Sequence, residues 1–379
     1  MNALLPAVLL RGTQKHPDLR AITWHLDDLY GASAGTQVRR VGDYQTTGFY
    51  FGFIEDRYAL SGDRILAAVV DFLRELLLEP VLEDGAFARD FVEGEKRNLI
   101  AVIEAQRNDK RVYASARMME LMCREDSFGI PRLGTKEDVA AITAQALYDH
   151  FRRILQQSRI DLFYVGSADP EQVAAHLRPL FSQIARSYLP LPAQTAFHIC
   201  EGVCHEETME VAQGKLCMGF VTPITLRHKG FVAMQLCNTV LGGGMISKLF
   251  MQIREKMSLC YDIGSGYHGS KGILTVAAGI DCAQETVVRE EVLHQLAQCQ
   301  QGNITEEELT AAKQALLSSL RTVHDTPGAI ESFYATAALS GLPLTVEAYM
   351  KAVETVTTEQ IARVAQTLQL HTVYFLRGE

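Results

Sequence analysis

The densest group of residues that could do chemistry follows three consecutive glycines, Gly242, Gly243 and Gly244. The chain continues MISKLFMQIREKMSLCYDIGSG, in which Arg254 lies beside an apolar stripe and Tyr261 follows seven residues later. A guanidinium and a phenol can both donate hydrogen bonds to a carbonyl oxygen or an oxyanion. The stripe has helical spacing and predicts a helix with one buried face, formed by Ile246, Leu249, Phe250, Ile253 and Met257.

The glycines do not indicate a phosphate-binding loop, because they are consecutive and the chain has no GxxxxGKS/T spacing. The alternative to a functional site is a flexible connection before a core helix, with Arg254 in a surface ion pair.

Metal ligation by paired histidines is excluded by spacing. None of the eleven histidines lies four residues from another, so neither HxxEH nor HExxH occurs in the chain. The segment His198-Ile-Cys200-Glu-Gly-Val-Cys204-His205 has a metal-like density of ligands, but its spacing matches no familiar zinc motif. The alternative is a set of residues at the edge of a domain.

Two further groups carry weak signals. Cys260 neighbours Tyr261 and precedes His268, but a catalytic Cys–His pair depends on the fold and not on sequence adjacency. The acidic group around His25, Asp27 and Asp28 is more typical of the polar end of a helix than of a ligand site.

Composition limits the possible functions. The chain has 379 residues, 47% apolar residues and a formal net charge of −9, which argues against binding nucleic acid or an anionic membrane. No apolar run is long enough to span a membrane, and the first residues do not fit a secretory signal. The eight scattered cysteines predict reduced thiols, and with them a cytoplasmic protein.

Periodicity predicts an amphipathic helix over 62–78, a long helical stretch over 87–123 and a buried strand over 159–170. A proline-bearing stretch without periodicity, 186–198, predicts a linker. We therefore expect an N-terminal domain over 1–185 and a C-terminal domain over 199–379.

The two halves echo one another in three places. Gly12 to Tyr30 corresponds to Gly244 to Tyr261, residues 91–110 resemble 308–326, and IDLFYVGS corresponds to HTVYFLRGE. Landmarks in the same order predict two copies of one α+β unit. The second half has strand-like sequence before its glycines, whereas the first half starts almost at the equivalent point, so the first strands of the first domain are expected to be missing.

The segment LGGGMISKLFMQIREKMSLCYDIGSG resembles the second-domain signature of the pitrilysin (insulinase, or inverzincin) family of zinc peptidases, LGGG-x-x-SRLF-x-x-(I/V)RE-x-x-GL-x-Y. The departures are Ser247-Lys248 for the serine-arginine pair and Ser258 for the usual glycine. The resemblance covers nearly the whole chain. It implies an α+β fold of two homologous domains, each a mainly antiparallel sheet with helices packed on one face. It also implies that Arg254 and Tyr261 hold the substrate backbone and stabilise the tetrahedral intermediate.

The zinc half of the family's site does not match. Where the family has HxxEH, this chain has Ala3 and Ala7 at the histidine positions and Pro6 at the general base. The distal glutamate corresponds to about Val102, and Glu95 and Glu104 nearby are expected to be solvated helix carboxylates. None of the four replacing side chains can bind a metal or transfer a proton.

The resemblance therefore implies a non-catalytic subunit of a heterodimeric zinc metallopeptidase. Such a chain needs no cofactor of its own, because zinc is expected only in a partner subunit of the same family. It would supply the Arg254–Tyr261 pair and part of the chamber wall for a peptide substrate, in a dimer. The alternative is a peptide-binding or scaffold pseudo-peptidase, as a homodimer, without a role in proteolysis.

Overall fold

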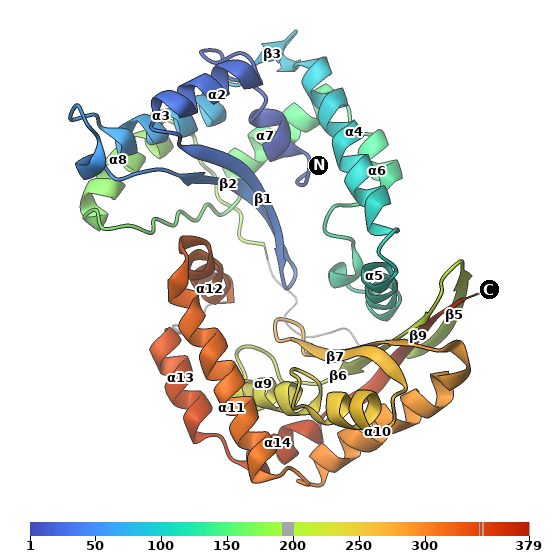
Figure 1. Cartoon of the computed structure of the whole chain (residues 1–379). Coiled ribbons are helices and arrows are strands. Elements are labelled where there is room, and N and C mark those ends of the chain that lie inside the picture. The colour runs from blue at the N-terminus through green and yellow to red at the C-terminus, as the bar shows by residue number, and fades with distance from the viewer. Residues whose placement is uncertain (192–200, 341, 343–344, 379) are drawn as a thin grey trace. The chain divides into compact units, whose positions relative to one another are not determined.

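The computed structural model describes residues 1–191, 201–340, 342 and 345–378, and the chain forms two compact units (Figure 1). The first unit comprises 1–105 and 132–193, and the second comprises 106–131 and 194–379. Both mix helices with mainly antiparallel sheets, so the predicted α+β class is confirmed. The part of the expected linker over 192–198 lies outside the described residues.

Helices dominate the first unit. The predicted helix over 62–78 forms as α3, and its stripe of Ile65, Val69, Phe72 and Leu76 is buried. The elements of this unit are α1 (Leu5–Leu9), α2 (Leu19–Asp28), β1 (Ser33–Val41), β2 (Tyr44–Gly52), α3 (Ile65–Leu78), β3 (Leu82–Glu83), β4 (Ala86–Phe87), α4 (Arg89–Gln106), α6 (Lys136–Ala140), α7 (Ala144–Gln157) and α8 (Pro170–Ser182).

The sheet structure of the first unit is sparse. In the described part of this unit, β1 and β2 form a two-stranded antiparallel hairpin, and β3 and β4 form a second short pair. The buried strand predicted over 159–170 is wrong: residues 159–165 belong to no strand, and Leu162 is 48% exposed. A strand needs neighbours that pair with its backbone groups, and no described strand pairs with this segment.

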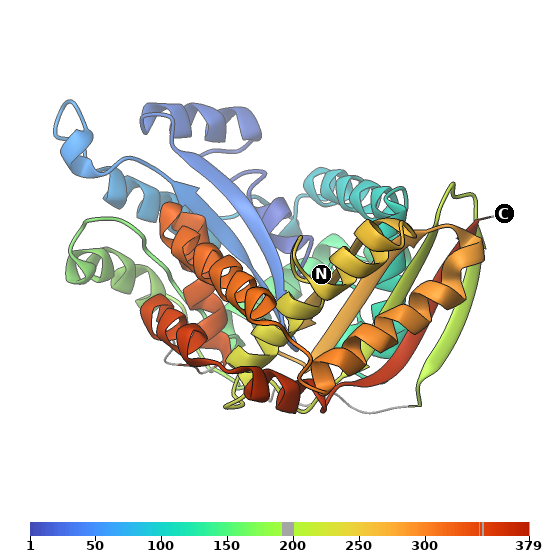
Figure 2. The same cartoon turned by 60° about the horizontal axis from the view of Figure 1, so that its bottom comes forward.

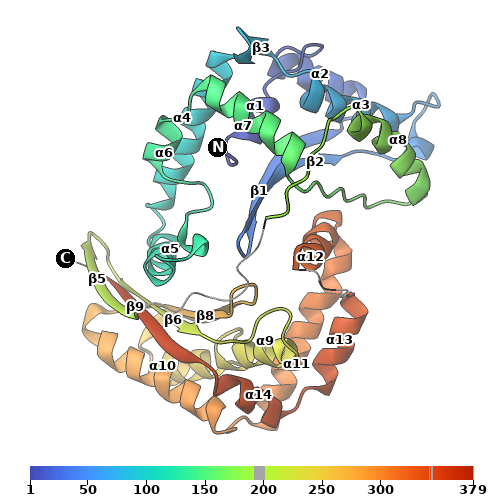
Figure 3. The ribbon, with the colours of Figure 1, turned by 180° about the vertical axis from the view of Figure 1, so that it is seen from behind.

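The second unit contains a five-stranded sheet in the order β5-β9-β6-β8-β7, which Figure 3 shows from behind. β5 and β9 run parallel, and the other neighbours run antiparallel. The elements are α5 (Lys110–Met122), β5 (Val203–Met209), β6 (Gly214–Val221), α9 (Phe231–Leu241), a π-helix (Phe250–Lys256), β7 (Cys260–His268), β8 (Ile273–Ile280), α10 (Glu285–Gln300), α11 (Glu306–Arg321), α12 (Pro327–Ser340), α13 (Val346–Thr355), α14 (Thr358–Ala365) and β9 (Gln369–Gly378).

Helices cover both faces of this sheet (Figure 1 and Figure 2). On one face, alternate residues of β6, including Leu216 and Phe220, join the main core with the helices that follow in the chain. On the other face, Cys217 and Tyr374 pack against α5. The approach of α5 is close, since a Cβ at Gly219 would lie 2.5 Å from the Met122 sulfur.

Residues 106–131 belong to the second unit, although the residues before and after them in the sequence belong to the first. The helical stretch expected over 87–123 is interrupted at Asp109, whose carboxylate caps α5 by accepting from Arg111 N and Val112 N. The segment is fixed by a buried ion pair: Lys271 Nζ lies 2.9 Å from Asp126 Oδ2, and the side chains are 0% and 1% exposed. This pair joins residues 145 positions apart in the sequence.

We expect Lys271→Met to lower the free energy of unfolding by about 3–5 kcal/mol, because it removes the cation that lies 2.9 Å from the buried Asp126 carboxylate. The double variant Lys271→Met/Asp126→Asn should lose less, since the asparagine is neutral and can still accept the bond from Phe128 N. Urea unfolding measures both. Arg178→Met, which breaks a pair with side chains 69% and 78% exposed, is the control and should cost under about 1 kcal/mol. A double variant no more stable than the single one would contradict this account.

Candidate functional site

Arg254 lies on the π-helix Phe250–Lys256, an irregular turn of the segment that was predicted as an ordinary helix. Such turns are rare and are frequent at functional sites, because they change the direction in which one side chain points. Ile253 is buried beneath it and holds the turn on the core. The Arg254 guanidinium lies 4.5 Å from the centre of the Phe250 ring and 3.2 Å from Glu255 Oε1. Its side chain is 38% exposed, so donors remain accessible to solvent.

Tyr261 occupies a second irregularity. Cys260 pairs with Ile280 and Asp262 pairs with Gly279, so Tyr261 is the extra residue of a β-bulge on β7. The side chain is 80% exposed. A bulge reorients a side chain at the start of an edge strand, and here it presents a phenol to solvent.

Ser258, between the two, has φ +53° and lies in the left-handed region. An L-residue in this conformation is strained by about 1–2 kcal/mol. This explains why the family that the sequence resembles usually has glycine at this position, since glycine adopts the left-handed conformation without strain. The connection from the π-helix to β7 therefore requires an unfavourable backbone conformation.

These residues line one open hollow of about 380 Å³, all of it within the second unit. Arg254 and Tyr261 offer hydrogen-bond donors, and two carboxylates provide acceptors. The lining residues are Gln213, Arg254, Glu255, Ser258, Leu259, Cys260, Tyr261, Gly279 and Asp281. Such a hollow can bind a peptide backbone, which offers both donors and acceptors.

Cysteine catalysis does not fit this hollow. Burial and the nearby Asp262 raise the pKa of the Cys260 thiol to about 11, so it stays protonated near neutral pH. His268 lies at the other end of the nine-residue strand β7, roughly 25 Å away along the strand. The Cys260–His268 pairing considered from the sequence is therefore excluded.

The first two of the three glycines pack closely against neighbouring segments. Gly242 O accepts from Ser265 N at 2.9 Å, and a Cβ at Gly242 would lie 2.8 Å from Ser265 Oγ. A Cβ at Gly243 would lie 2.7 Å from Thr239 Cα, whereas Gly244 faces open space. Gly242 and Gly243 thus permit close packing, which supports the exclusion of a phosphate loop.

The positions that the resemblance assigns to the zinc motif lie in the first unit, at and before the start of α1 and on α4. Pro6 is at the start of the helix, with Ala7 beside it and Ala3 just before it. Their neighbours Leu4, Leu5, Val8 and Leu9 are buried, so the helix serves the core. Val102, on α4, is 51% exposed. Methyl groups, a proline ring and an isopropyl group have no donor atoms for zinc, so these residues do not fit the metal.

The two nearby carboxylates both have partners. Arg11 Nη1 lies 3.3 Å from Glu95 Oε1, and the Glu95 side chain is only 14% exposed. The expectation that Glu95 is solvated is therefore wrong, because Arg11 pairs with it. Glu104 is exposed and pairs with Lys136. In the described part of the chain, no group of three or more histidine, cysteine or acidic residues could hold a metal ion.

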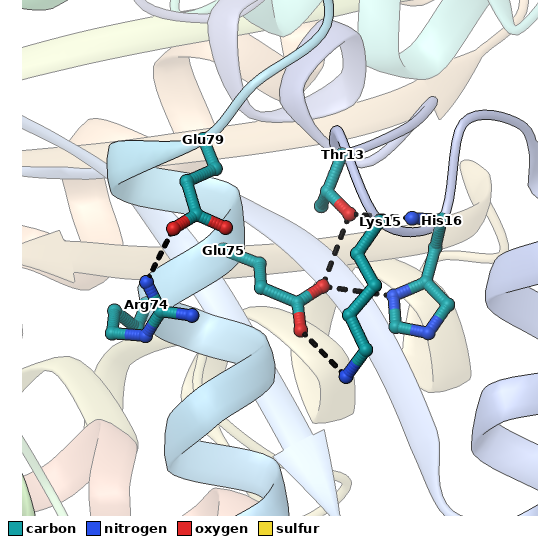
Figure 4. A network of polar contacts seen from close by, with 6 residues as sticks. All are labelled: Thr13, Lys15, His16, Arg74, Glu75 and Glu79. Carbon is teal, nitrogen blue, oxygen red and sulfur yellow. Dashed lines mark hydrogen bonds and ion pairs between the residues drawn. The ribbon is translucent and has the colours of Figure 1, made fainter.

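A polar network that the sequence did not predict surrounds Glu75 on α3 (Figure 4). This carboxylate is 2% exposed, and it accepts from Thr13 Oγ1 at 3.0 Å and Lys15 Nζ at 3.3 Å. His16 Nδ1 lies 2.8 Å from it. One signal could have indicated the network: Glu75 adjoins the apolar stripe of α3 and therefore falls on the side of the helix that is buried. The network fixes the loop after α1.

His25 extends this network. Its ring stacks on His16 with centroids 4.3 Å apart. Burial first, and then the charge of His16, lower the pKa of His25. Together with Asp27 and Asp28 it forms the last turn of α2, so the helix-end interpretation is confirmed.

The remaining cysteine and histidine predictions are partly outside the described residues. His198 and Cys200 are outside them, while Cys204 and His205 lie on β5, where Cys204 is exposed. The buried cysteines that form no disulfide are Cys123, Cys217, Cys237 and Cys299.

The fold and the site define a class: a peptidase-like α+β protein that keeps an arginine–tyrosine hollow and lacks the ligands for a catalytic metal. The family description "Peptidase M16 inactive domain" matches residues 141–316. The "Probable inactive metalloprotease YmfF" of Bacillus subtilis is 31% identical over 380 residues, covering 100% of this chain and 88% of the relative. The chain belongs to the M16, or pitrilysin, family of peptidases and lacks its catalytic zinc motif.

Solved structures of other proteins have the same fold. A conserved protein from Enterococcus faecalis V583 has a TM-score of 0.91 at 29% identity, covering 99% of this chain and 89% of that one. A peptidase M16 inactive domain from Pseudomonas fluorescens has a TM-score of 0.77 at 18% identity, covering 100% and 88% of the two chains, and supports the fold.

Among the described residues, no helix combines the length and apolarity needed to cross a membrane.

We expect Ser258→Gly to raise the free energy of unfolding by about 0.5–1 kcal/mol, because glycine relieves the left-handed strain but gains entropy in the unfolded chain. Ser258→Ala is the matched control and should bring no gain, since alanine keeps the strain. Urea unfolding of the three proteins checks this. A glycine variant no more stable than the alanine variant would show that the conformation is not strained.

We expect Glu75→Gln to make the free energy of unfolding less dependent on pH in the acid range. Burial raises the pKa of Glu75, but the bonds from His16 and Thr13 outweigh it, so its pKa in the folded state is lowered. A lowered pKa stabilises the fold above the unfolded value of about 4.3, and this contribution is lost as pH falls through the folded value. The difference in the free energy of unfolding between wild type and variant should therefore shrink as the pH falls from 7 to 3. Glu171→Gln, whose side chain is 78% exposed, should leave the pH dependence unchanged.

Proposed function

We propose that this chain is the non-catalytic subunit of a heterodimeric zinc metallopeptidase. The observation that carries the proposal is the contrast between its two half-sites. Arg254 on a π-turn and Tyr261 on a β-bulge line one hollow, joined through the strained Ser258. The positions of the zinc ligands carry only apolar side chains. Unfavourable backbone conformations cluster at binding and catalytic sites, and here three of them surround two exposed polar side chains.

In this proposal the partner supplies the zinc, which activates water, and the general base. This chain binds and orients the substrate. Arg254 donates to the carbonyl of the extended peptide, and the Tyr261 hydroxyl donates to the oxygen on which negative charge develops. The core of the second unit anchors the backbone of both residues, through buried Ile253 beside Arg254 and the pairing of β7 with β8 at Tyr261. The chain also contributes part of the chamber wall and has no turnover by itself.

The thiols support a cytoplasmic location for this assembly, because seven cysteines in the described part form no disulfide.

The second candidate is a peptide-binding or scaffold pseudo-peptidase without a role in proteolysis. The ion pair of Arg254 with Glu255 favours it, since this pair is also what a surface arginine without a substrate would form. The two candidates differ in whether a zinc-bearing relative associates with the chain.

Affinity capture of the tagged chain from a lysate of its own host tests this difference. Bound proteins are identified by mass spectrometry, and zinc content and peptide cleavage are measured for the chain alone and for the complex. A relative with an HxxEH motif that turns the inert chain into a peptidase supports the subunit role. An inert chain without such a relative supports the scaffold role.

In the active complex, Arg254→Ala and Tyr261→Phe should each reduce the rate by about 10²–10³, as the loss of one oxyanion donor does elsewhere. Lys256→Ala is the matched control, because this exposed cation lies on the same π-helix and does not line the hollow. Unchanged urea unfolding shows that the variants are folded. Full activity of both variants would contradict the shared site.

A further inference from the structure

A buried ion pair lies six residues before Arg254 in the second unit. Lys248 Nζ lies 2.8 Å from Glu308 Oε1 and 2.9 Å from Glu308 Oε2, so one ammonium group binds both oxygens of one carboxylate. The Lys248 side chain is only 9% exposed and that of Glu308 only 19%. Lysine is rarely buried to this degree without a partner. Neither residue lines the Arg254–Tyr261 hollow, so contact with a bound peptide does not explain the pair.

The Glu308 carboxylate is held by the start of α11. It closes a capping box with Thr305: Thr305 N donates to Glu308 Oε2 at 2.8 Å, and Glu308 N donates to Thr305 Oγ1 at 3.1 Å. These reciprocal bonds fix the glutamate side chain on the first turn of the helix. Farther along, Ala312 and Leu320 bury α11 in the main core. The carboxylate is therefore a rigid acceptor for Lys248.

Lys248 is the first helical residue of the segment that carries Arg254, and this segment continues directly into the π-helix Phe250–Lys256. Met257 N donates to Gln252 O at 3.0 Å, which is the five-residue bond of a π-turn. Such a turn contains one residue more than the α-turn that it replaces. For the segment to relax into an α-helix, the chain on one side of the turn must rotate by about 100° around the helix axis, the angle between successive residues.

The end of the segment toward β7 cannot make this rotation without losing its contacts. Ile253 is 0% exposed, and its carbonyl oxygen accepts from Leu259 N at 3.0 Å. The next residue, Cys260, already pairs with Ile280 in the sheet. Relaxation of the π-turn must therefore rotate the other end, which begins at Lys248.

Two contacts hold that other end. Leu249 is 0% exposed and packs closely on Gly242, where a Cβ would lie 2.9 Å from Leu249 Cδ1. Apolar contact is non-directional, so it keeps Leu249 buried but does not by itself fix the rotation of the helix. The Lys248–Glu308 pair does fix it, because each hydrogen bond requires its donor and acceptor to be aligned. A buried pair of this kind adds little net stability, since desolvation offsets the attraction, and its main effect is to select one arrangement of the segment.

We propose that Lys248 is a positioning residue, whose ion pair with Glu308 holds the π-turn and thereby sets the direction of Arg254. Arg254 lies inside the turn, so its direction depends on the extra residue. With the turn in place, its guanidinium lies 4.5 Å from the centre of the Phe250 ring, and the residue lines the hollow. The consequence for peptide cleavage rests on the proposed function, whereas the consequence for the backbone does not.

The first test uses the full chain alone. Crystal structures show the turn, and the side-chain Nε–H signal of Arg254 in NMR spectra, assigned by its loss in Arg254→Lys, reports the surroundings of the guanidinium. In Lys248→Met we expect an α-turn without the Met257 N–Gln252 O bond, together with a displaced Arg254 signal. Lys248→Arg should restore both, because a guanidinium also binds two carboxylate oxygens.

Two further variants separate positioning from a loss of stability. Lys248→Met/Glu308→Gln leaves no charge buried alone, and glutamine keeps the capping box, so this variant should fold and show the same α-turn and displaced signal. Lys313→Met is the matched control, because the Lys313 ammonium joins α11 to the end of α13 by donating to Glu354 O at 2.9 Å. It should leave the Arg254 signal unchanged. Urea unfolding of each protein shows that folded chains are compared.

An unchanged turn and signal in Lys248→Met would overturn the proposal, by showing that the burial of Leu249 suffices. An equal displacement of the signal in Lys313→Met, or no restoration in Lys248→Arg, would also overturn it. Each of these outcomes is decided without a zinc-bearing partner.

The second test uses the active complex with the zinc-bearing partner. Misplacing a group that contacts the substrate costs about 10²-fold in rate, so Lys248→Met should lower kcat/KM by about that factor, and Lys248→Arg should restore it. Full activity of Lys248→Met in that complex, despite an altered turn, contradicts the positioning role. If no such complex exists, the subunit proposal fails, and the first test still decides whether Lys248 sets the direction of Arg254.

Discussion

The second unit depends on a buried ion pair between Lys271 and Asp126, at 2.9 Å and shielded from water. Two charges are removed from solvent only where the geometry compensates for their desolvation. The pair fixes residues 106–131 on the sheet, so that α5 covers the face opposite the main core. It joins the loop between β7 and β8 to the end of that segment. β7, the edge strand that carries Tyr261, is thereby held in a sheet packed on both faces.

That rigid sheet makes the irregular backbone of the hollow possible. A π-turn, a left-handed serine and a β-bulge follow one another between Phe250 and Tyr261. Each is unfavourable in an isolated chain and persists only where the surroundings determine it. Their combined effect is to present one arginine and one tyrosine to solvent from a buried framework. The first unit has no equivalent strain at its lost zinc positions, where α1 is an ordinary apolar helix.

Much of this could be predicted from residue types and spacing. The stripe Ile65, Val69, Phe72 and Leu76 predicts α3 by periodicity alone, and the substitutions at Ala3, Pro6 and Ala7 exclude zinc ligation by chemistry alone. The strand prediction over 159–165 failed for a physical reason. The residue pattern indicates which side chains prefer burial. A strand forms only when neighbouring strands make hydrogen bonds with its backbone.

The sequence by itself determined the α+β class, the family and the loss of its HxxEH motif, and it singled out Arg254 and Tyr261 as candidates, because these depend on local periodicity and on which atoms a side chain carries. The tertiary structure decided the rest. It paired Lys271 with Asp126 across 145 positions, surrounded Glu75 with Thr13 and His16, and left 159–165 outside any strand. Such contacts depend on which segments, far apart in the sequence, the fold brings together, and a local sequence pattern does not specify them.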